Sequence, residues 1–369
     1  DVICVVRGAS DKAVAAALAE SERRLATSTK VPGGQGGAGP APMAPRSIGM
    51  VLARAPQSNL ALISVPGEYA AAEATKALRL GLNVMLFSDG IPVADEVAMK
   101  SFAQARDLLV MGPDCGTAIV NGVPLAFANV VRRGAIGCVG ASGTGLQQVT
   151  SLIDRFGQGV SHAIGTGGRD LSEAVGGVTM LAGIRLLAAD RGTRVLVLVS
   201  KPPARTVATR VLAAARKIRK PVVVCFVGAE PPAAKDGNLH YARTLEDAAR
   251  IAASLAAGRA PARRPATRTP ATRPRLARGQ RYVRGLYSGG TFAYEASWLL
   301  GELFGDLLGD EVWSNAPVQK KLSLRDPWSS DGHTIVDLGA DEFTRGRPHP
   351  MIDHRLRYER MLREAEDPE

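Results

Sequence analysis

The feature that most constrains the fold is a regular alternation of short apolar runs with amphipathic segments. Three apolar runs, 59–65, 83–88 and 108–112, are separated by two stretches with helical periodicity, 67–81 and 95–107. A strand, a crossover helix and a second strand in this order form a parallel βαβ unit, whose sheet is covered by helices. The pattern predicts an α/β fold with parallel sheets.

A second alternation starts near residue 135. Apolar runs that read as strands are each followed by a helical segment; the runs are 135–140, 160–165, 194–200 and 221–228. Four such βα units predict a flavodoxin-like domain. Ligands of open parallel sheets bind beyond the carboxyl ends of the strands, where the strand order reverses, so the loops after these runs predict a binding site.

A weak repeat of this pattern follows. Residues 283–296 resemble 136–149, and 334–353 take the place of 162–177. The second copy reaches Glu369 before its sheet is complete, and the chain starts at Asp1 within an apparent strand. We expect a fragment of a longer protein.

The positive charge of the chain is concentrated in one segment. The net charge is +11, and the stretch from Arg259 to Arg284 holds nine arginines and no acidic residue, which leaves +2 for the rest. This stretch is rich in Pro, Ala and Thr and predicts an interdomain linker. An RNA-binding arm is the alternative, but no aromatic residue is interleaved before Tyr282. We expect no nucleic-acid partner.

Cysteine spacing and hydropathy indicate the compartment. The four cysteines, Cys4, Cys115, Cys138 and Cys225, form no C-x-x-C pair, which favours a reducing cytoplasm. No apolar run is long enough to span a bilayer. We expect a cytoplasmic protein without a membrane partner.

The turn GASGTG, residues 140–145, is a candidate anion site. Ser142, Gly143 and Thr144 would place backbone N–H groups at a helix N-terminus, which favours anions. An ordinary turn with Ser142 or Thr144 as N-cap remains the alternative. The anion-binding candidates of the repeat are Ser288, Gly290 and Thr291, and we expect Lys201 and Arg169, from neighbouring loops, to act on the bound anion as catalytic residues.

Several short motifs resemble the α subunit of succinyl-CoA synthetase across residues 59–258. They are VPGEYA (65–70), SDGIPVADEV (88–97), MGPDCG (111–116), the SGT turn and GTGGRD (165–170). Together with LYSGGT and GRPHPMID, they resemble the FdrA branch of that superfamily over almost the full chain.

The resemblance implies a Rossmann-like CoA-binding domain followed by flavodoxin-like ligase domains. We expect an N-terminal segment and connector at 1–47, the CoA-binding-type domain at 48–133, a ligase-type domain at 134–258, the linker at 259–281 and an incomplete second ligase-type domain at 282–369.

Two departures from the synthetase bear on mechanism. Its phosphorylated histidine lies in a loop after the fourth strand of the ligase domain, and residues 229–249 are too short for that loop. His240 abuts the next strand, and we interpret it as structural. Where the synthetase has a glutamate, this chain has Ser200 and Lys201, and a lysine suits a mobile anion.

The resemblance implies a subunit of an oxamate carbamoyltransferase of allantoin breakdown, acting with partner subunits. Its substrates would be carbamoyl phosphate and oxamate, or an acyl phosphate. The alternatives are an acyl-CoA ligase subunit, with the phosphohistidine supplied elsewhere, and a non-catalytic CoA- or anion-binding scaffold. CoA is implied only by the family, because no glycine-rich CoA loop is recognisable before Asn59.

For several other residues, both a functional and a structural role are possible from the sequence. Pro66, Asp114 and Cys115 are candidates for CoA or ligand contact, although Asp114 and Cys115 could equally shape a turn, and Asp170 could cap a helix. Arg345, Arg347, His349 and His354 cluster around a proline-bounded loop, of which Arg347 and His349 are anion-binding candidates. Asp337 and Asp341 could bind Mg²⁺, although two acids in a loop do not define a metal site, and we assign no metal ligands.

Overall fold

The fold is taken from a computed structural model. It describes residues 45–230, 232–262, 279–308, 312–315 and 322–367, with a short stretch inside 10–23. The chain divides into two compact units, residues 1–54 and 55–369. The first contains helix α2 (Ile48–Arg54), and the site described below lies wholly in the second. Cys4, most of the expected connector at 1–47 and most of the linker at 259–281 fall outside the described residues.

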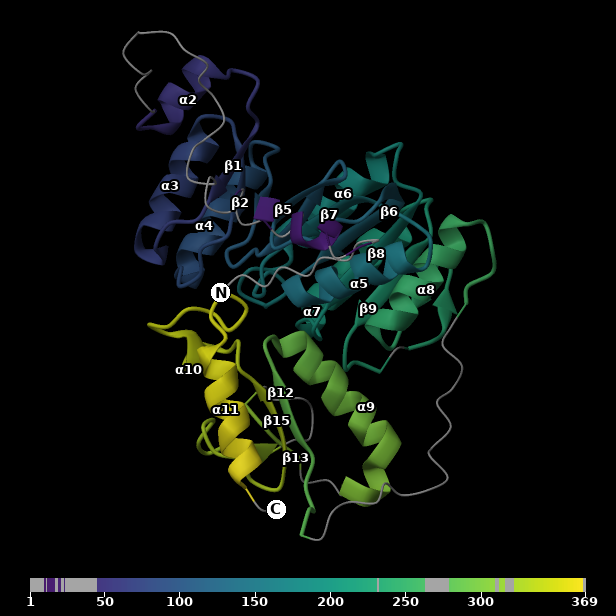
Figure 1. The fold of residues 1–369 in the computed structure, drawn as a ribbon. Coiled ribbons are helices and arrows are strands. Elements are labelled where there is room, and N and C mark those ends of the chain that lie inside the picture. Colours follow the sequence, from purple (N-terminus) through teal and green to yellow (C-terminus); the bar gives the residue numbers. More distant parts are fainter. Residues whose placement is uncertain are drawn as a thin grey trace. The chain divides into compact units, whose positions relative to one another are not determined.

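The first sheet of the second unit is the predicted βαβαβ unit (Figure 1). Its parallel strands are β1 (Leu60–Ile63), β2 (Asn83–Leu86) and β3 (Val110–Met111). The crossover helices are α3 (Gly67–Arg79) and α4 (Val93–Gln104). Strand β2 buries Val84, Met85 and Leu86 completely, because helices cover both faces of a parallel sheet.

The second sheet has eight strands in the order β10-β11-β9-β8-β6-β7-β4-β5. Its parallel core consists of β6 (Arg133–Gly140), β7 (Val160–Gly165), β8 (Val195–Ser200) and β9 (Val222–Phe226). The chain runs from β6 to β7 on one side and then returns to β8 on the other. The strand order therefore reverses at β6, as expected for a ligand-binding sheet.

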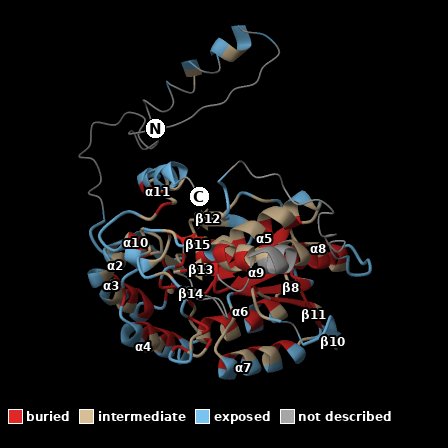
Figure 2. Cartoon of the chain, turned by 90° about the horizontal axis from the view of Figure 1, so that it is seen from below, coloured by how far each residue is buried: buried red, intermediate tan, exposed pale blue. Residues whose placement is uncertain are grey.

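Helices cover both faces of this sheet. On one face α5 (Gly143–Arg155) and α8 (Leu245–Ala256) share a hydrophobic cluster with β6, β8 and β9. On the other, α6 (Val178–Ala189) and α7 (Arg205–Arg216) form a cluster that also takes in Met85 and Met111 of the first sheet. Figure 2 shows the buried residues gathered in the strands. Each buried Leu, Ile or Val contributes about 1.5–3 kcal/mol.

Two strand pairs of this sheet differ from the expected pattern. A hairpin of β4 (Thr117–Val120) and β5 (Val123–Ala126) pairs antiparallel with β7, although its residues fall in the expected first domain, 48–133. Its turn is Asn121-Gly122, with φ of 52° and 82°, the conformation that a two-residue hairpin favours. On the opposite edge, β10 (Lys235–Asp236) and β11 (Leu239–Tyr241) intervene between β9 and α8.

The third sheet is built from the repeat. Its parallel strands lie in the order β12-β15-β13-β14, with β12 (Arg284–Tyr287), β13 (Val312–Ser314), β14 (Leu322–Ser323) and β15 (His333–Asp337). Helix α9 (Gly290–Leu308) follows β12, and α10 (Asp341–Thr344) and α11 (Arg355–Glu366) follow β15.

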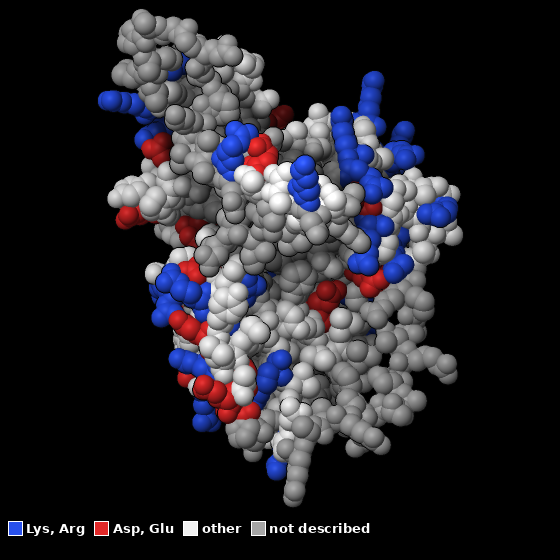
Figure 3. All heavy atoms as spheres, viewed as in Figure 1, with Lys and Arg blue, Asp and Glu red and all other residues white. Residues whose placement is uncertain are grey.

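The described surface near the end of the chain carries charges of both signs. In Figure 3, basic and acidic side chains are interspersed in the region of α10 and α11, as the sequence RLRYERMLREAE of α11 requires. Among the described residues, no helix combines the length and apolarity needed to cross a membrane. The predicted α/β class with parallel sheets is confirmed.

Candidate functional site: a cavity at the carboxyl ends of three sheets

A cavity of about 440 Å³ lies where the carboxyl ends of the three sheets converge. The segments after β1, β2 and β3 contribute Ser64, Asp89 and Asp114. Those after β6, β8 and β12 contribute the SGT turn, Lys201 and residues 288–291. The predicted residues that line it are Asp114, Cys115, Ser142, Gly143, Thr144, Lys201, Ser288, Gly290, Thr291, Arg347 and His349.

The N-terminus of α5 forms one wall. Ser142 is its N-cap, and the side-chain oxygen accepts a hydrogen bond from the Gly145 N–H at 2.9 Å. The first turn contains no acidic residue, so the positive end of the helix dipole is not neutralised. Ser142 is therefore a helix N-cap, as expected for an ordinary strand-to-helix turn, and it also forms part of the cavity wall.

The N-terminus of α9 meets that of α5 at this wall. The hydroxyls of Ser142 and Thr291 lie 2.6 Å apart and share a hydrogen bond. Gly289 packs so closely on Thr144 that an added Cβ would lie 2.8 Å from its methyl carbon. Like α5, α9 has no acidic residue in its first turn. Two sets of backbone N–H groups thus border one cavity, an arrangement suited to an anion.

Lys201 brings a full positive charge to the same point. A Cβ added at Gly290 would lie 2.3 Å from Lys201 Nζ and 2.7 Å from Asp337 Oδ2, so both groups approach the start of α9. Burial raises the pKa of Asp337, and the Lys201 ammonium opposes that rise. Asp337 Oδ1 also accepts the Gly339 N–H at 2.9 Å. A larger residue at 290 would displace the ends of the Lys201 and Asp337 side chains.

A buried hydroxyl without a protein partner adjoins α5. Thr117 is 1% exposed, and its Oγ1 has no hydrogen-bond partner among the described residues. It lines the cavity, and a Cβ added at Gly143 would lie 3.6 Å from it. A buried hydroxyl without a partner is costly, and a bound ligand at the start of α5 would supply one.

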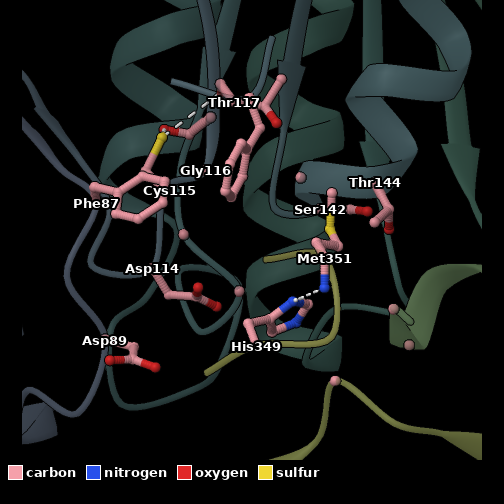
Figure 4. A pocket seen from close by; sticks show the side chains of 18 of the residues that line it. Phe87, Asp89, Asp114, Cys115, Gly116, Thr117, Ser142, Thr144, His349 and Met351 are labelled. Carbon is pink, nitrogen blue, oxygen red and sulfur yellow. Dashed lines mark hydrogen bonds between the residues drawn. The ribbon is translucent and has the colours of Figure 1, made fainter. Parts of the chain in front are cut away.

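The opposite part of the cavity is acidic. Figure 4 shows Asp89 and Asp114 across from Ser142 and Thr144. Enclosure by the cavity walls, and secondly the Asp89 carboxylate, raise the pKa of Asp114 to about 6. The Asp114 side chain still reaches the solvent of the cavity, so it can exchange its proton.

His349 lies between these two parts in Figure 4. Its Nδ1 accepts the Met351 N–H at 3.2 Å, which assigns the proton of the neutral ring to Nε2. Burial lowers the pKa of His349, while Asp89 opposes the change. Nε2 lies against Gly339, where an added Cβ would be 2.8 Å away. A neutral N–H donor is therefore available near neutral pH.

Arg169 and Pro66 do not line the cavity. The guanidinium of Arg169 donates to the Ile91 carbonyl at 2.7 Å and pairs with Glu96 at 3.1 Å. Arg169, which the sequence placed at the bound anion, is thus held by a buried carboxylate on α4 instead. Pro66 instead precedes the first residue of α3.

The structure gives Asp170 and His240 the structural roles considered for them. Asp170 accepts the N–H groups of Thr179 and Met180 at 3.1 and 2.9 Å and so caps α6. His240 is buried on strand β11.

Cys115 lies in the cavity wall with its thiol turned into the protein. Burial raises the pKa of Cys115 to about 12, and Sγ donates to the Gly165 carbonyl at 3.4 Å. Such a thiol is not a nucleophile at neutral pH.

Asp337 and Asp341, the two acids considered for Mg²⁺, lie in different surroundings. No cluster of three or more His, Cys, Asp or Glu residues suited to a metal occurs within the described ranges. Asp337 lies beside Lys201 instead, and Asp341 is exposed at the start of α10. Arg345 and His354 are not among the residues that line the cavity, unlike Arg347 and His349.

Sequence reasoning missed Asp89 and Thr117. Asp89 stands directly after an apolar strand, in the segment SDG, the same signal that selected Asp114. Thr117 had no comparable signal, because it belongs to a hairpin strand that enters the second sheet only in the folded chain. The Asn121-Gly122 dipeptide would have revealed that hairpin.

Comparisons with known proteins agree with this fold. A family model described as the CoA binding domain matches residues 131–228. The uncharacterized protein YahF of Escherichia coli (strain K12) is 47% identical over 327 residues, 88% of this chain and 62% of YahF. A succinate–CoA ligase [ADP-forming] subunit alpha 2 of Archaeoglobus fulgidus is 29% identical over 188 residues, 49% of this chain and 63% of that subunit.

Among solved structures, ATP citrate lyase from Methanothrix soehngenii in complex with citrate and coenzyme A is similar with a TM-score of 0.45. The identity is 19%, and the match covers 57% of this chain and 36% of that one. The chain spans about three fifths of the length of the curated relatives it matches. The sequence matches support the superfamily of CoA-binding proteins that includes succinyl-CoA ligase α subunits.

The helix N-termini differ in how well they would suit a phosphate group of CoA. Helices α3 and α4 carry acidic residues in their first turns, Glu68 in one and Asp95 and Glu96 in the other, which disfavours an anion there. The family-model match, residues 131–228, includes α5, whose first turn is free of acids. A phosphate group of CoA would therefore fit better at α5 than at α3 or α4.

Proposed function

We propose that this chain is a subunit of a carbamoyl-transferring enzyme and holds the phosphate of carbamoyl phosphate between the N-termini of α5 and α9. The observation that carries the proposal is the meeting of two helix N-termini whose first turns hold no acidic residue, joined by the Ser142–Thr291 hydrogen bond, with Lys201 and its neighbour Asp337 at the start of α9. Together they form a preorganised anion site.

This chemistry needs position and positive potential rather than a nucleophile. As the carbamoyl carbon is attacked, the bond to the phosphate oxygen breaks and negative charge grows on the departing phosphate. The N–H groups of α5 and α9 and the Lys201 ammonium would stabilise that charge. The short connection from β9 through the β10–β11 hairpin supports a mechanism without a phosphohistidine loop at this position.

A second candidate is a subunit of an acyl-CoA ligase. It is supported by the match to the CoA binding domain and by relatives named succinate–CoA ligase and sulfoacetate-CoA ligase subunits. On this alternative the α5 terminus receives a phosphate group of CoA, and the phosphorylated histidine comes from another subunit. In both cases we expect partner subunits, as the names of the relatives suggest, and a cytoplasmic location.

A thermal-shift titration of the full chain distinguishes these functions. Inorganic phosphate, carbamoyl phosphate, oxamate, CoA and ATP are added separately, because a ligand that binds the native state stabilises it by about 2.7 kcal/mol at a hundredfold excess over Kd. Stabilisation by phosphate and carbamoyl phosphate, without CoA or ATP, supports carbamoyl transfer. Stabilisation by CoA, without stabilisation by carbamoyl phosphate, supports the acyl-CoA ligase function instead.

A further inference from the structure

The acidic end of the cavity is not used by the phosphate proposal. Asp89 and Asp114 lie there, His349 lies next to them in the middle of the cavity, and Asp89 interacts electrostatically with both Asp114 and His349 (Figure 4). Two carboxylates repel a phosphate or a carboxylate but accept hydrogen bonds from N–H groups. One cavity thus has an end for an anion and an end for a hydrogen-bond donor.

We propose that Asp114 receives the N–H of a nitrogen nucleophile, an amide or amine, and takes its proton during carbamoyl transfer. The inference rests on the proposed function and assigns the residue that accepts the proton. The nitrogen lone pair forms the new C–N bond to the carbamoyl carbon, and the C–O bond to phosphate breaks with its electron pair on the phosphate. The displaced nitrogen proton passes to the Asp114 carboxylate and then to solvent.

The backbone holds Asp114 in place for this role. Its N–H donates to the Ser88 carbonyl at 3.0 Å, and its φ is 57°, in the left-handed region that a non-glycine residue seldom adopts. Such conformations persist where the surrounding structure enforces them and are common at functional sites. Gly168, at the end of β7, packs close enough that an added Cβ would lie 3.8 Å from Asp114 Oδ2.

The charges around Asp114 come from four elements. Asp89 after β2 and Asp341 of α10 disfavour its ionised form, whereas Arg169 after β7 and Lys201 after β8 favour it. His349, from the loop after α10, lines the same cavity. With its pKa near 6, Asp114 is ionised at neutral pH yet basic enough to accept a proton.

His349 completes the arrangement. Its Nε2–H, assigned by the Met351 hydrogen bond to Nδ1, is a neutral donor for the oxygen of the carbamoyl group. Asp114 and His349 would thus act on the nitrogen and on the carbonyl oxygen respectively, while α5 and α9 hold the phosphate.

Oxamate and oxalate form a matched pair of probes for this site. They differ by one group, a primary amide against a carboxylate, so only oxamate offers N–H donors. We expect the full chain to bind oxamate at least tenfold more tightly than oxalate at pH 7.5 in calorimetric titrations. The preference falls as the pH drops through about 6, because protonation of Asp114 removes the acceptor.

Three variants test whether Asp114 causes the preference for oxamate over oxalate. Asp114→Asn abolishes it and lowers the rate of carbamoyl transfer to oxamate about a hundredfold, with inorganic phosphate bound as tightly as before or more tightly. In Asp89→Asn, the pH at which the preference for oxamate is lost becomes lower, because the Asp89 charge raises the pKa of Asp114. Asp107→Asn is the matched control, because Asp107 also has a positive φ, 54°, and does not line the cavity.

The outcomes separate this inference from the phosphate proposal. Equal binding of oxamate and oxalate by the unmodified chain, or an Asp114→Asn variant that discriminates and transfers normally, overturns the role of Asp114 while phosphate binding stands. Failure of phosphate to bind overturns the proposed function, and the oxamate preference is then still measurable without phosphate. If Asp114→Asn does not fold, the pH dependence of the oxamate preference in Asp89→Asn tests the role of Asp114. An unchanged pH dependence in that variant overturns the role.

Discussion

At the residue scale, Lys100 shows how a full charge is accommodated in the interior. Its side chain is 1% exposed, and Nζ donates to Glu96 at 2.8 Å, to Asp170 at 2.7 Å and to the Thr166 carbonyl at 3.0 Å. All three ammonium donors are satisfied, and Asp170 in turn caps α6. The network joins the first sheet's α4 to the loop after β7.

Removal of this charge should be strongly destabilising. Lys100→Met leaves Asp170 buried without its counter-charge and Glu96 paired with Arg169 alone, and we expect a loss of about 3–5 kcal/mol in the free energy of unfolding. Lys76→Met is the matched control, because the Lys76–Glu73 pair is exposed and should cost less than about 0.5 kcal/mol. Urea denaturation measures both, and similar losses would contradict the network's importance.

Lys201 is expected to act on ligand affinity rather than stability. It is exposed at the end of β8 and approaches the start of α9, so Lys201→Ala should weaken phosphate binding about tenfold with little change in Tm. Lys217→Ala, an exposed lysine at the end of α7, is the control. Unchanged phosphate affinity in calorimetry would remove Lys201 from the anion site.

At the element scale, the close contact between the loops after β3 and β7 depends on a glycine. Gly167 has a φ of 86°, and an added Cβ would lie 2.3 Å from the Pro113 carbonyl oxygen. This contact places the loop after β7 directly against the segment that carries Asp114. Backbone atoms cannot move aside as a flexible side chain can, so the two loops would have to separate.

Substitution of two glycines with nearly the same φ separates the cost of this contact from the cost of the backbone conformation. Gly157 has a φ of 79° and nothing within 4 Å of an added Cβ, so Gly157→Ala should cost about 1–2 kcal/mol from the backbone alone. Gly167→Ala should cost at least 2 kcal/mol more, as for other overpacked sites. Thermal unfolding compares the two, and equal losses would show that the loops separate freely.

At the scale of the whole molecule, α9 is anchored to the second sheet by Glu295. Its carboxylate accepts the Leu245 N–H at 2.7 Å, at the start of α8. Burial raises the pKa of Glu295, and this backbone hydrogen bond opposes the rise. The anchor holds the third sheet's first helix in the position where Thr291 meets Ser142.

Loss of this anchor should affect both stability and binding. Glu295→Ala leaves the Leu245 N–H without its acceptor, and we expect a loss of about 1–3 kcal/mol together with weaker phosphate binding. Glu173→Ala is the control, because Glu173 is exposed and accepts a hydrogen bond from the Thr206 hydroxyl at 3.2 Å. A variant that loses stability but binds phosphate normally would show that α9 keeps its position without Glu295.

The sequence by itself determined the α/β class, the order of the main strands and helices and the turn at Ser142, because these follow from local hydrophobic period and capping chemistry. Most of the site residues that it selected line the cavity, since polar groups at strand ends share one edge of a parallel sheet. Only the tertiary structure decided that Arg169 binds Glu96, that the hairpin 117–126 joins the second sheet, and that Asp89 neighbours Asp114. These are contacts between residues far apart in the chain, and their partners are set by packing rather than by local sequence.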